Sequence, residues 1–124
     1  SAFVNDGSMI KPVLEYSETP QFWYPDAFSK EAADTIRNDL IQVIENPAGT
    51  AHEAHLDGVT LAGKTGTAEI KASQEDTSGT ELGWFNAFIA DSDSPEQLLV
   101  VSMVEDVKDR GGSHYLVPKV RSIF

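Results

Sequence analysis

A ten-residue stretch, LAGKTGTAEI at positions 61–70, holds residues whose types and order could bind a substrate. Lys64 is a cation among small residues, in a chain that has only nine Lys and Arg residues against twenty Asp and Glu residues. Thr65 adds a hydroxyl group, Gly66 a position without a side chain and Thr67 a further backbone amide, all within about 12 Å at the rise of a strand. These are the groups needed to hold a peptide-like substrate that carries a carboxylate.

Several of these residues also have a purely structural interpretation. Burying an ammonium group is costly unless it is paired, so a lone strand lysine such as Lys64 more often snorkels or lies on an exposed sheet edge. Glu69 and Trp84 are further candidate substrate-binding residues. A solvated carboxylate at a strand end is the more common role for a residue such as Glu69, and large aromatic residues in a central strand more often pack in a core. We assign Phe85 to the core and leave Trp84 open.

The motif needs a strand to carry it, and the sequence predicts one over residues 59–70, where β-branched residues are frequent and no helix-capping pattern competes. Two further strands are predicted over residues 82–91 and 97–106, joined by a turn at 92–96. The polar segment 71–81 predicts a long exposed hairpin loop. Three successive strands with hairpin-type links predict an antiparallel meander.

The clearest predicted helix covers residues 30–45. Ser29 can cap it, acidic residues in its early turns suit the helix macrodipole, and Pro47 stops it. The polar residues expected in water are Arg37, Asn38 and Glu45. The expected buried face consists of apolar residues at helical spacing, namely Ala33, Ile36, Leu40, Val43 and Ile44.

The two ends of the chain give weaker signals. An edge strand is predicted over residues 9–14, and the proline- and aromatic-bearing segment 17–28 is expected to be a loop. Residues 114–124 predict the opening of a last helix, with Ser113 as its cap and Pro118 near its first turn.

Composition limits the class of protein. The 124 residues are 40% hydrophobic and 23% charged, which is typical of a single globular domain. The sequence has no cysteine, which excludes disulfides, thiolate zinc sites and cysteine nucleophiles. A formal net charge of −11 opposes binding to nucleic acid and to anionic membrane surfaces, so neither is an expected partner. Apolar residues begin at once without an initiator methionine, so we expect a fragment of a larger protein.

The residues around the motif resemble those of penicillin-binding proteins. KTGTAE is similar to the lysine-threonine-glycine motif of serine acyl-transfer enzymes that react with penicillin. GWFNAFIAD, LLVVSMVED and a GG pair then follow in the order of the closing part of a penicillin-binding transpeptidase domain. SAFVNDGSMIKP and NPAGTA resemble upstream segments of class B penicillin-binding proteins of Gram-positive bacteria, including the low-affinity type linked to β-lactam resistance. The resemblance covers nearly the whole chain.

This resemblance implies an α+β fold, in which an antiparallel β-sheet with flanking helices forms part of a penicillin-binding or β-lactamase-like transpeptidase fold. It identifies residues 1–124 as a C-terminal fragment of that domain. By the resemblance, Lys64 would supply positive potential and hydrogen bonds, and Thr65 would donate its hydroxyl to the carboxylate of the substrate or β-lactam. Gly66 would let the substrate backbone approach by strand addition, and the Thr67 amide would form half of an oxyanion hole. Lys64 and Thr67 are thus the candidate catalytic residues.

Such an enzyme also needs a nucleophilic serine three residues before a lysine on a helix. SMIK offers Ser8 and Lys11 at this spacing, but Pro12 disfavours helical geometry at Lys11, and the preceding Asp6-Gly7 pair predicts a turn. We therefore reject this pair and expect the nucleophile in a part of the domain outside the chain. The serine-x-asparagine motif of the family is also absent from the sequence.

Two histidines have a spacing that can hold a metal on a helix. His52 and His55 are three residues apart with Glu53 between them, but they lie in a predicted connector at 48–58. No third ligand is evident, so we interpret them as ordinary loop histidines. We expect neither a metal nor an organic cofactor.

The resemblance implies a parent enzyme that cross-links peptidoglycan as a D,D-transpeptidase. Its serine would be acylated by a D-Ala-D-Ala stem peptide or by a β-lactam, and it would act outside the cytoplasmic membrane, held by an anchor. Alternatives are a D,D-carboxypeptidase, a serine β-lactamase, or a non-catalytic module that forms a homodimer through exposed sheet surface. The chain by itself is expected to be inactive.

Overall fold

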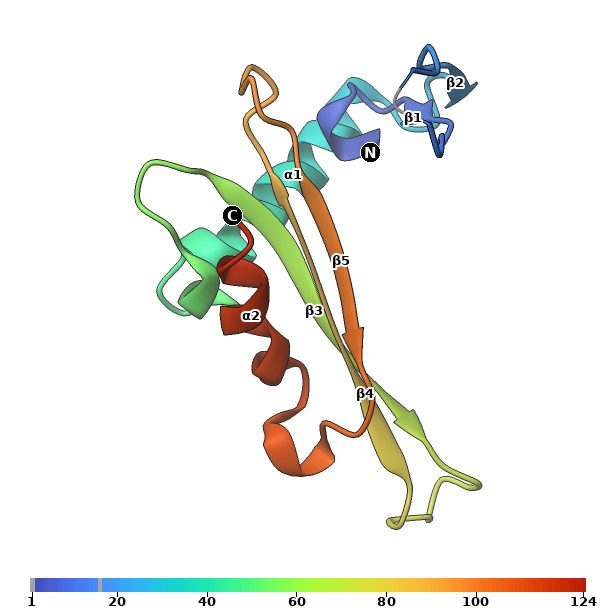
Figure 1. Ribbon diagram of the computed structural model, residues 1–124, viewed down its shortest axis with the longest axis vertical. Coiled ribbons are helices and arrows are strands. Elements are labelled where there is room, and N and C mark those ends of the chain that lie inside the picture. The colour runs from blue at the N-terminus through green and yellow to red at the C-terminus, as the bar shows by residue number, and fades with distance from the viewer. Residues whose placement is uncertain (1, 16) are drawn as a thin grey trace.

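A three-stranded antiparallel sheet forms the centre of the computed structural model, which describes residues 2–15 and 17–124. Its strands are β3 (Leu61–Ile70), β4 (Thr80–Ile89) and β5 (Leu99–Val104), in the spatial order β3-β4-β5 (Figure 1). The hairpin that joins β3 to β4 extends beyond the rest of the molecule. The predicted antiparallel meander is therefore confirmed.

Local turns move the strand ends away from their predicted positions. β3 begins at Leu61 rather than at Val59, because Leu56 and Val59 form an isolated β-bridge around Gly58. Gly58 has a φ of +84°, a left-handed conformation that suits glycine. β4 begins earlier than predicted, at Thr80, whose hydroxyl donates a hydrogen bond to Asp106 Oδ1 at 2.9 Å. The predicted hairpin loop is correspondingly shorter.

Strand register sorts the side chains of the sheet onto two faces. Thr65 is paired with Phe85, which in turn is paired with Ser102, so these three side chains point to the same side. On this core face Phe85, Leu61 and Ala87 are fully buried, and the prediction that Phe85 belongs to the core is confirmed. The opposite, open face leaves large apolar side chains exposed, namely Trp84, Leu99, Val101 and Met103.

The C-terminal segment covers the core face. A 3₁₀ helix at Gly112–Leu116 leads into the short helix α2 (Val117–Arg121), which lies beside the sheet (Figure 1). The predicted cap at Ser113 is wrong, because Ser113 lies inside the 3₁₀ helix and is buried. Gly112, with a φ of +64°, starts this tighter helix, so α-helical geometry begins only at Val117. Pro118 lies in the first turn of α2, as predicted.

The helix α1 (Lys30–Glu45) forms where it was predicted. Ser29 Oγ accepts a hydrogen bond from Ala32 N at 3.2 Å, which confirms the predicted N-cap. Along the predicted apolar face Ala33 and Ile44 are fully buried, and the other positions are half-buried. Ile44 joins the core under β3, where a Cβ added at Gly63 would lie 3.0 Å from its side chain.

Two polar residues of α1 that were expected in water have partners instead. Arg37 Nη2 donates to Asp34 Oδ1 at 2.8 Å. Glu45 accepts a hydrogen bond from the backbone amide of Leu61 at 3.3 Å, and its other oxygen lies 2.7 Å from His55 Nδ1. Glu45 therefore ties the end of α1 to the first residue of β3, a long-range role that helical spacing alone does not reveal.

The N-terminal segment forms a separate two-stranded unit near the N-terminal end of α1 (Figure 1). β1 (Met9–Ile10) is shorter than the predicted edge strand and pairs antiparallel with β2 (Phe22–Tyr24). The expectation of a loop throughout 17–28 is therefore wrong at β2. Its three aromatic residues suit a strand, but only pairing with a distant segment makes them one.

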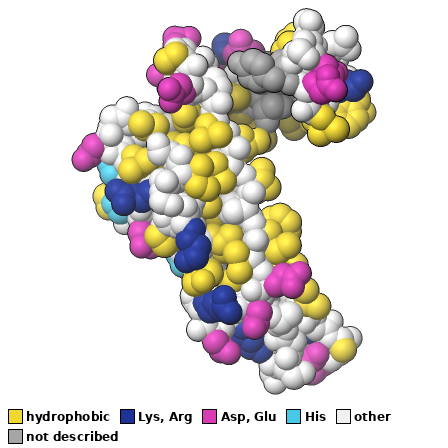
Figure 2. All heavy atoms as spheres, viewed as in Figure 1, with side chains coloured by type: hydrophobic (Ala, Val, Ile, Leu, Met, Phe, Trp, Pro, Cys, Tyr) yellow, Lys and Arg dark blue, Asp and Glu magenta, His cyan; other side chains and the backbone are white. Residues whose placement is uncertain are grey.

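The surface mixes charges of both signs. Of the nine basic residues, four lie between Lys108 and Arg121. On the face shown in Figure 2, Lys and Arg side chains gather over the lower half of the molecule with acidic side chains among them. Among the described residues no helix combines the length and the apolar character needed to cross a membrane.

Candidate functional site

The outer edge of β3 presents the backbone groups of the motif. Ala90 N donates to Thr60 O at 2.9 Å, and hydrogen-bonded and non-hydrogen-bonded pairs alternate along an antiparallel ladder. The even-numbered residues of β3 therefore bond to β4, while the amide and carbonyl groups of the odd-numbered residues point outward. Among the described residues no strand pairs with this edge. The Thr67 amide thus points outward, where it can meet a ligand, and the Thr65 carbonyl points to the same side.

Lys64 is exposed on the open face and bends toward the same edge. Its Nζ donates a hydrogen bond to the carbonyl oxygen of Thr65 at 2.8 Å. Directly across the ladder lies Asn86, whose Oδ1 is buried and has no hydrogen-bond partner within the described part of the chain. The ammonium group remains in solvent, so its cost of burial is avoided, and it adds positive charge beside the outward-facing amide.

The two threonines of the motif place their hydroxyl groups on the other side of the strand. Thr65 Oγ1 lies 3.2 Å from Thr50 Oγ1, a hydrogen bond in which either hydroxyl can donate. Thr67 is exposed, and a Cβ added at Gly112 would lie 3.4 Å from its Oγ1. The segments that precede β3 and follow β5 therefore both approach the motif, although they are far apart in the sequence.

The two glycines of β3 have different surroundings. A Cβ added at Gly63 would lie 2.7 Å from Asn86 O and 3.0 Å from Ile44 Cδ1, so packing within the chain requires glycine there. A Cβ added at Gly66 would meet only Trp84 Cβ, at the ordinary contact distance of 3.6 Å. The fold therefore does not require glycine at position 66.

Glu69 and Trp84 differ in their relation to the motif. Trp84 lies directly opposite Gly66 in the ladder and is 36% exposed, so it borders the motif on the open face. Glu69 is exposed near the end of β3 and forms an ion pair with Lys71. The hydrogen bond from Lys71 and the charge of Lys71 lower the pKa of Glu69 below its ordinary value. Glu69 is thus a solvent-exposed carboxylate that is ion-paired with Lys71 and lies beyond the motif.

The loop after β3 is organised by a carboxylate for which the sequence indicated no role. Asp76 accepts hydrogen bonds from Ala72 N at 3.0 Å, from Ser78 N at 2.8 Å and from the Ser78 hydroxyl at 2.6 Å. The Ser78 hydroxyl is the main reason that the pKa of Asp76 is lowered to about 2, followed by the two backbone amides. Such hydrogen bonds from an Asp side chain to nearby backbone amides are typical of local turns.

Lys108 fastens the same loop from the segment after β5. Its Nζ donates to the carbonyl oxygens of Thr77 and, at 3.1 Å, Gly79. The neighbouring Val107 amide donates to Glu81 O at 3.0 Å. The predicted long loop is therefore held against the body of the protein at its second half.

The other candidates from the sequence are not assembled into sites. Ser8 and Lys11 flank the strand β1, so the pair lacks the helical geometry that a serine-lysine motif needs, as expected from Pro12 and the Asp6-Gly7 turn. Ser8 Oγ instead accepts a hydrogen bond from Asp26 N at 3.1 Å. His52 Nδ1 lies 2.9 Å from Ile44 O, and its ring stacks on that of His55. No group of three or more ligand residues suited to a metal occurs in residues 2–15 and 17–124.

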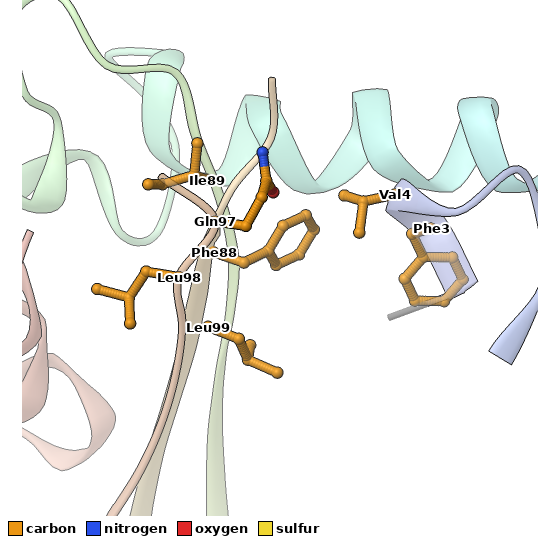
Figure 3. Close-up of a pocket in the computed structure, with 7 residues that line it drawn as sticks. All are labelled: Phe3, Val4, Phe88, Ile89, Gln97, Leu98 and Leu99. Carbon is orange, nitrogen blue, oxygen red and sulfur yellow. The ribbon is translucent and has the colours of Figure 1, made fainter. Parts of the chain in front are cut away.

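An apolar pocket lies away from the motif, between the N-terminal segment and the facing ends of β4 and β5 (Figure 3). Gln97 is its only polar lining side chain among the described residues. The pocket contains no residue of β3, so it offers none of the groups described above. Its apolar lining consists of Phe3, Val4, Phe88, Ile89, Leu98 and Leu99.

Comparison with known proteins gives concordant results. The whole chain, residues 1–124, matches the family model described as the penicillin-binding protein transpeptidase domain. The chain is 42% identical over 124 residues to penicillin-binding protein 3 of Bacillus subtilis (strain 168). This alignment covers 98% of the chain but only 18% of the relative, so the chain spans about a fifth of that protein.

The fold is also similar to a solved structure. The apo TP domain of penicillin-binding protein 3 from Burkholderia pseudomallei matches 98% of the chain with a TM-score of 0.68 and 20% sequence identity. The match covers 38% of the solved chain. At this identity the similarity concerns the fold, and it agrees with the predicted α+β arrangement of an antiparallel sheet with flanking helices.

The hydrogen bonds to Asp76 predict how the loop responds to acid. Because the pKa is lowered from 3.8 to about 2, the stabilisation is complete above pH 3.8 and is lost as the pH falls through about 2. An NMR titration of the Asp76 carboxyl group should therefore have its midpoint near pH 2. In a Ser78→Ala variant the midpoint should move up toward 3.8. A midpoint at 3.8 in both proteins would contradict this account of the loop.

Proposed function

Because the chain belongs to the penicillin-binding protein transpeptidase domain family, we propose that it forms the substrate-binding edge of a serine D,D-transpeptidase. The observation that carries this proposal is the outer edge of β3, where the Thr67 amide points away from β4. A strand edge with free amide and carbonyl groups can bind an extended peptide as an additional strand. The stem peptide of peptidoglycan, which ends in D-Ala-D-Ala, is the proposed occupant.

Each residue of the motif then has a role. The Thr67 amide donates to the oxygen that becomes negative in the tetrahedral intermediate, and Lys64 contributes positive potential beside it. Thr65 donates its hydroxyl to the terminal carboxylate of the peptide or to the carboxylate of a β-lactam. Gly66 admits the substrate backbone, and the exposed Trp84 borders this space. Glu69 lies further along the strand, where its ion pair leaves it at most a peripheral contact.

The reaction proceeds through an ester on a serine that lies outside the 124 residues. The serine oxygen attacks the carbonyl carbon of the penultimate D-alanine, the peptide C–N bond breaks, and the terminal D-alanine leaves with a proton. An amine of a neighbouring stem peptide then attacks the ester, forms an amide bond and restores the serine hydroxyl. A β-lactam forms the same kind of ester with its opened ring. None of these steps requires a metal or an organic cofactor.

On this proposal the chain belongs to the C-terminal part of its domain and is inactive alone. Two observations support a nucleophile located elsewhere. The chain aligns with only 18% of the related protein, and Ser8 lies next to a strand and not on a helix. The parent acts on peptidoglycan outside the cytoplasmic membrane, where it is anchored. A D,D-carboxypeptidase or a serine β-lactamase would use the same motif with water as the final acceptor.

A second candidate is a non-catalytic module that forms a homodimer. The open face of the sheet favours it, because exposed apolar residues in neighbouring strands suit contact with another surface. Val101 and Leu99 are 62% and 55% exposed, and Met103 is 42% exposed. This candidate and the enzyme differ in whether a serine of the longer protein is acylated.

Labelling with a fluorescent penicillin tests the proposed function. The chain alone and a transpeptidase domain of full family length that contains it are incubated with the label and run on a denaturing gel. We expect a covalent, serine-dependent band only for the longer protein, because only it contains the nucleophile. If both proteins are folded before the gel, neither is labelled, and the chain dimerises, the result would favour the non-catalytic module. A label at Ser8 of the short chain would overturn our rejection of that serine.

Two glycine substitutions in the longer domain separate substrate binding from folding. Gly66→Ala should leave the unfolding temperature nearly unchanged, because the added methyl group meets only Trp84 Cβ at 3.6 Å. It should slow acylation about 10- to 100-fold by displacing the ligand backbone. Gly63→Ala is the control and should lower the free energy of unfolding by about 1–3 kcal/mol through overpacking. Equal acylation rates for Gly66→Ala and wild type would contradict the assigned path of the substrate.

A further inference from the structure

We propose that Thr50 is a positioning residue that directs the hydroxyl proton of Thr65 toward the carboxylate of the ligand. The inference rests on the proposed function, because the ligand carboxylate is assigned there to Thr65. Its structural basis is the 3.2 Å contact between Thr50 Oγ1 and Thr65 Oγ1. Fifteen residues separate the two in sequence, so the contact is made by the fold and not by local geometry.

Backbone hydrogen bonds anchor the residues on both sides of Thr50. Before it, Gly49 N donates to Asn46 O at 2.7 Å, and after it Ala51 N donates to Val43 O at 3.0 Å. A Cβ added at Gly49 would lie 2.3 Å from Val43 O, so this turn packs directly on the end of α1. Ala51 is 1% exposed and belongs to the core. The packing of α1 therefore holds the backbone at Thr50, and the exposed Thr50 side chain extends from it to Thr65.

The chemistry of hydroxyl groups determines which way the hydrogen bond runs when ligand is bound. A hydroxyl group has one proton to donate and can accept two hydrogen bonds. If Thr65 donates its proton to Thr50, it has none left for a carboxylate, which can only accept. When Thr50 donates instead, Thr65 accepts at one side and donates to the carboxylate at the other. Hydrogen bonds arranged in such a chain strengthen one another.

The arrangement predicts an effect that is specific to the ligand carboxylate. Thr50 touches Thr65 and no other group of the motif in the hydrogen bonds of the described residues. Removing its hydroxyl therefore leaves the outward Thr67 amide and Lys64 in place. The binding of a ligand should weaken without a change in the rate of the chemical step, because the carboxylate contact is equally present in the ground state and the transition state.

The test compares acylation kinetics of Thr50→Val and Thr50→Ser in the longer domain, with benzylpenicillin and its methyl ester as probes. For benzylpenicillin, Thr50→Val should raise the dissociation constant of the non-covalent complex about 3- to 10-fold. The rate constant of the acylation step should stay unchanged. Thr50→Ser, which keeps the hydroxyl, should stay within about twofold of wild type. With the methyl ester, which lacks the carboxylate, Thr50→Val and wild type should react equally.

A double variant provides the decisive control. Thr65→Val should weaken benzylpenicillin binding at least as much as Thr50→Val, and Thr50→Val should add nothing in the Thr65→Val background, because the two hydroxyls act as one unit. Additive losses, or an equal loss with the methyl ester, would overturn the positioning role. Normal acylation of Thr65→Val itself would instead contradict the carboxylate assignment in the proposed function. Thr50 is exposed and Thr65 is half-buried, so neither substitution removes a core side chain. Measured unfolding temperatures check that the variants are folded.

Discussion

The pairing of β3 with β4 is the constraint on which the rest of the site depends. Its register directs the amides of odd-numbered residues in β3 outward and places Thr65 and Phe85 on the same face. Because Phe85 is fully buried, a slip of one residue must turn one of the two strands over, which would either expose Phe85 or turn the Thr67 amide toward β4. The hydrophobic core therefore fixes which backbone groups the motif presents, and folding and binding geometry are set by one register.

The local features of this fold could be predicted from the sequence because they arise from local physics. The cap at Ser29, the helical spacing of Ile44 with its neighbours and the β-branched residues of β3 each act within a few positions along the chain. The motif could be recognised for the same reason, since its lysine, hydroxyl, glycine and amide follow one another. Its family was also indicated by residues in order along the chain, and the match to the transpeptidase family over residues 1–124 agrees with that.

The features that sequence reasoning missed all depend on contacts between distant segments. Glu45 was expected in water, but it accepts a hydrogen bond from the first amide of β3. β2 becomes a strand only because β1 lies beside it, and α2 starts late because the chain enters it through a 3₁₀ helix packed on the sheet. The hydrogen bonds of the Thr50 hydroxyl and of Lys108 are also of this kind. Each joins two segments that are far apart in the sequence, so helical or strand spacing does not reveal it. These contacts hold the motif and its loop in place.

The central claim is that the outward-facing edge of β3 receives the acyl group of the ligand. A crystal structure of the full-length transpeptidase domain acylated by benzylpenicillin tests it most directly. The account predicts that the acyl carbonyl oxygen accepts a hydrogen bond from Thr67 N and that the carboxylate lies at Thr65 Oγ1. An adduct whose acyl oxygen lies away from Thr67 N, so that the Thr67 amide has no bond to it, would contradict it.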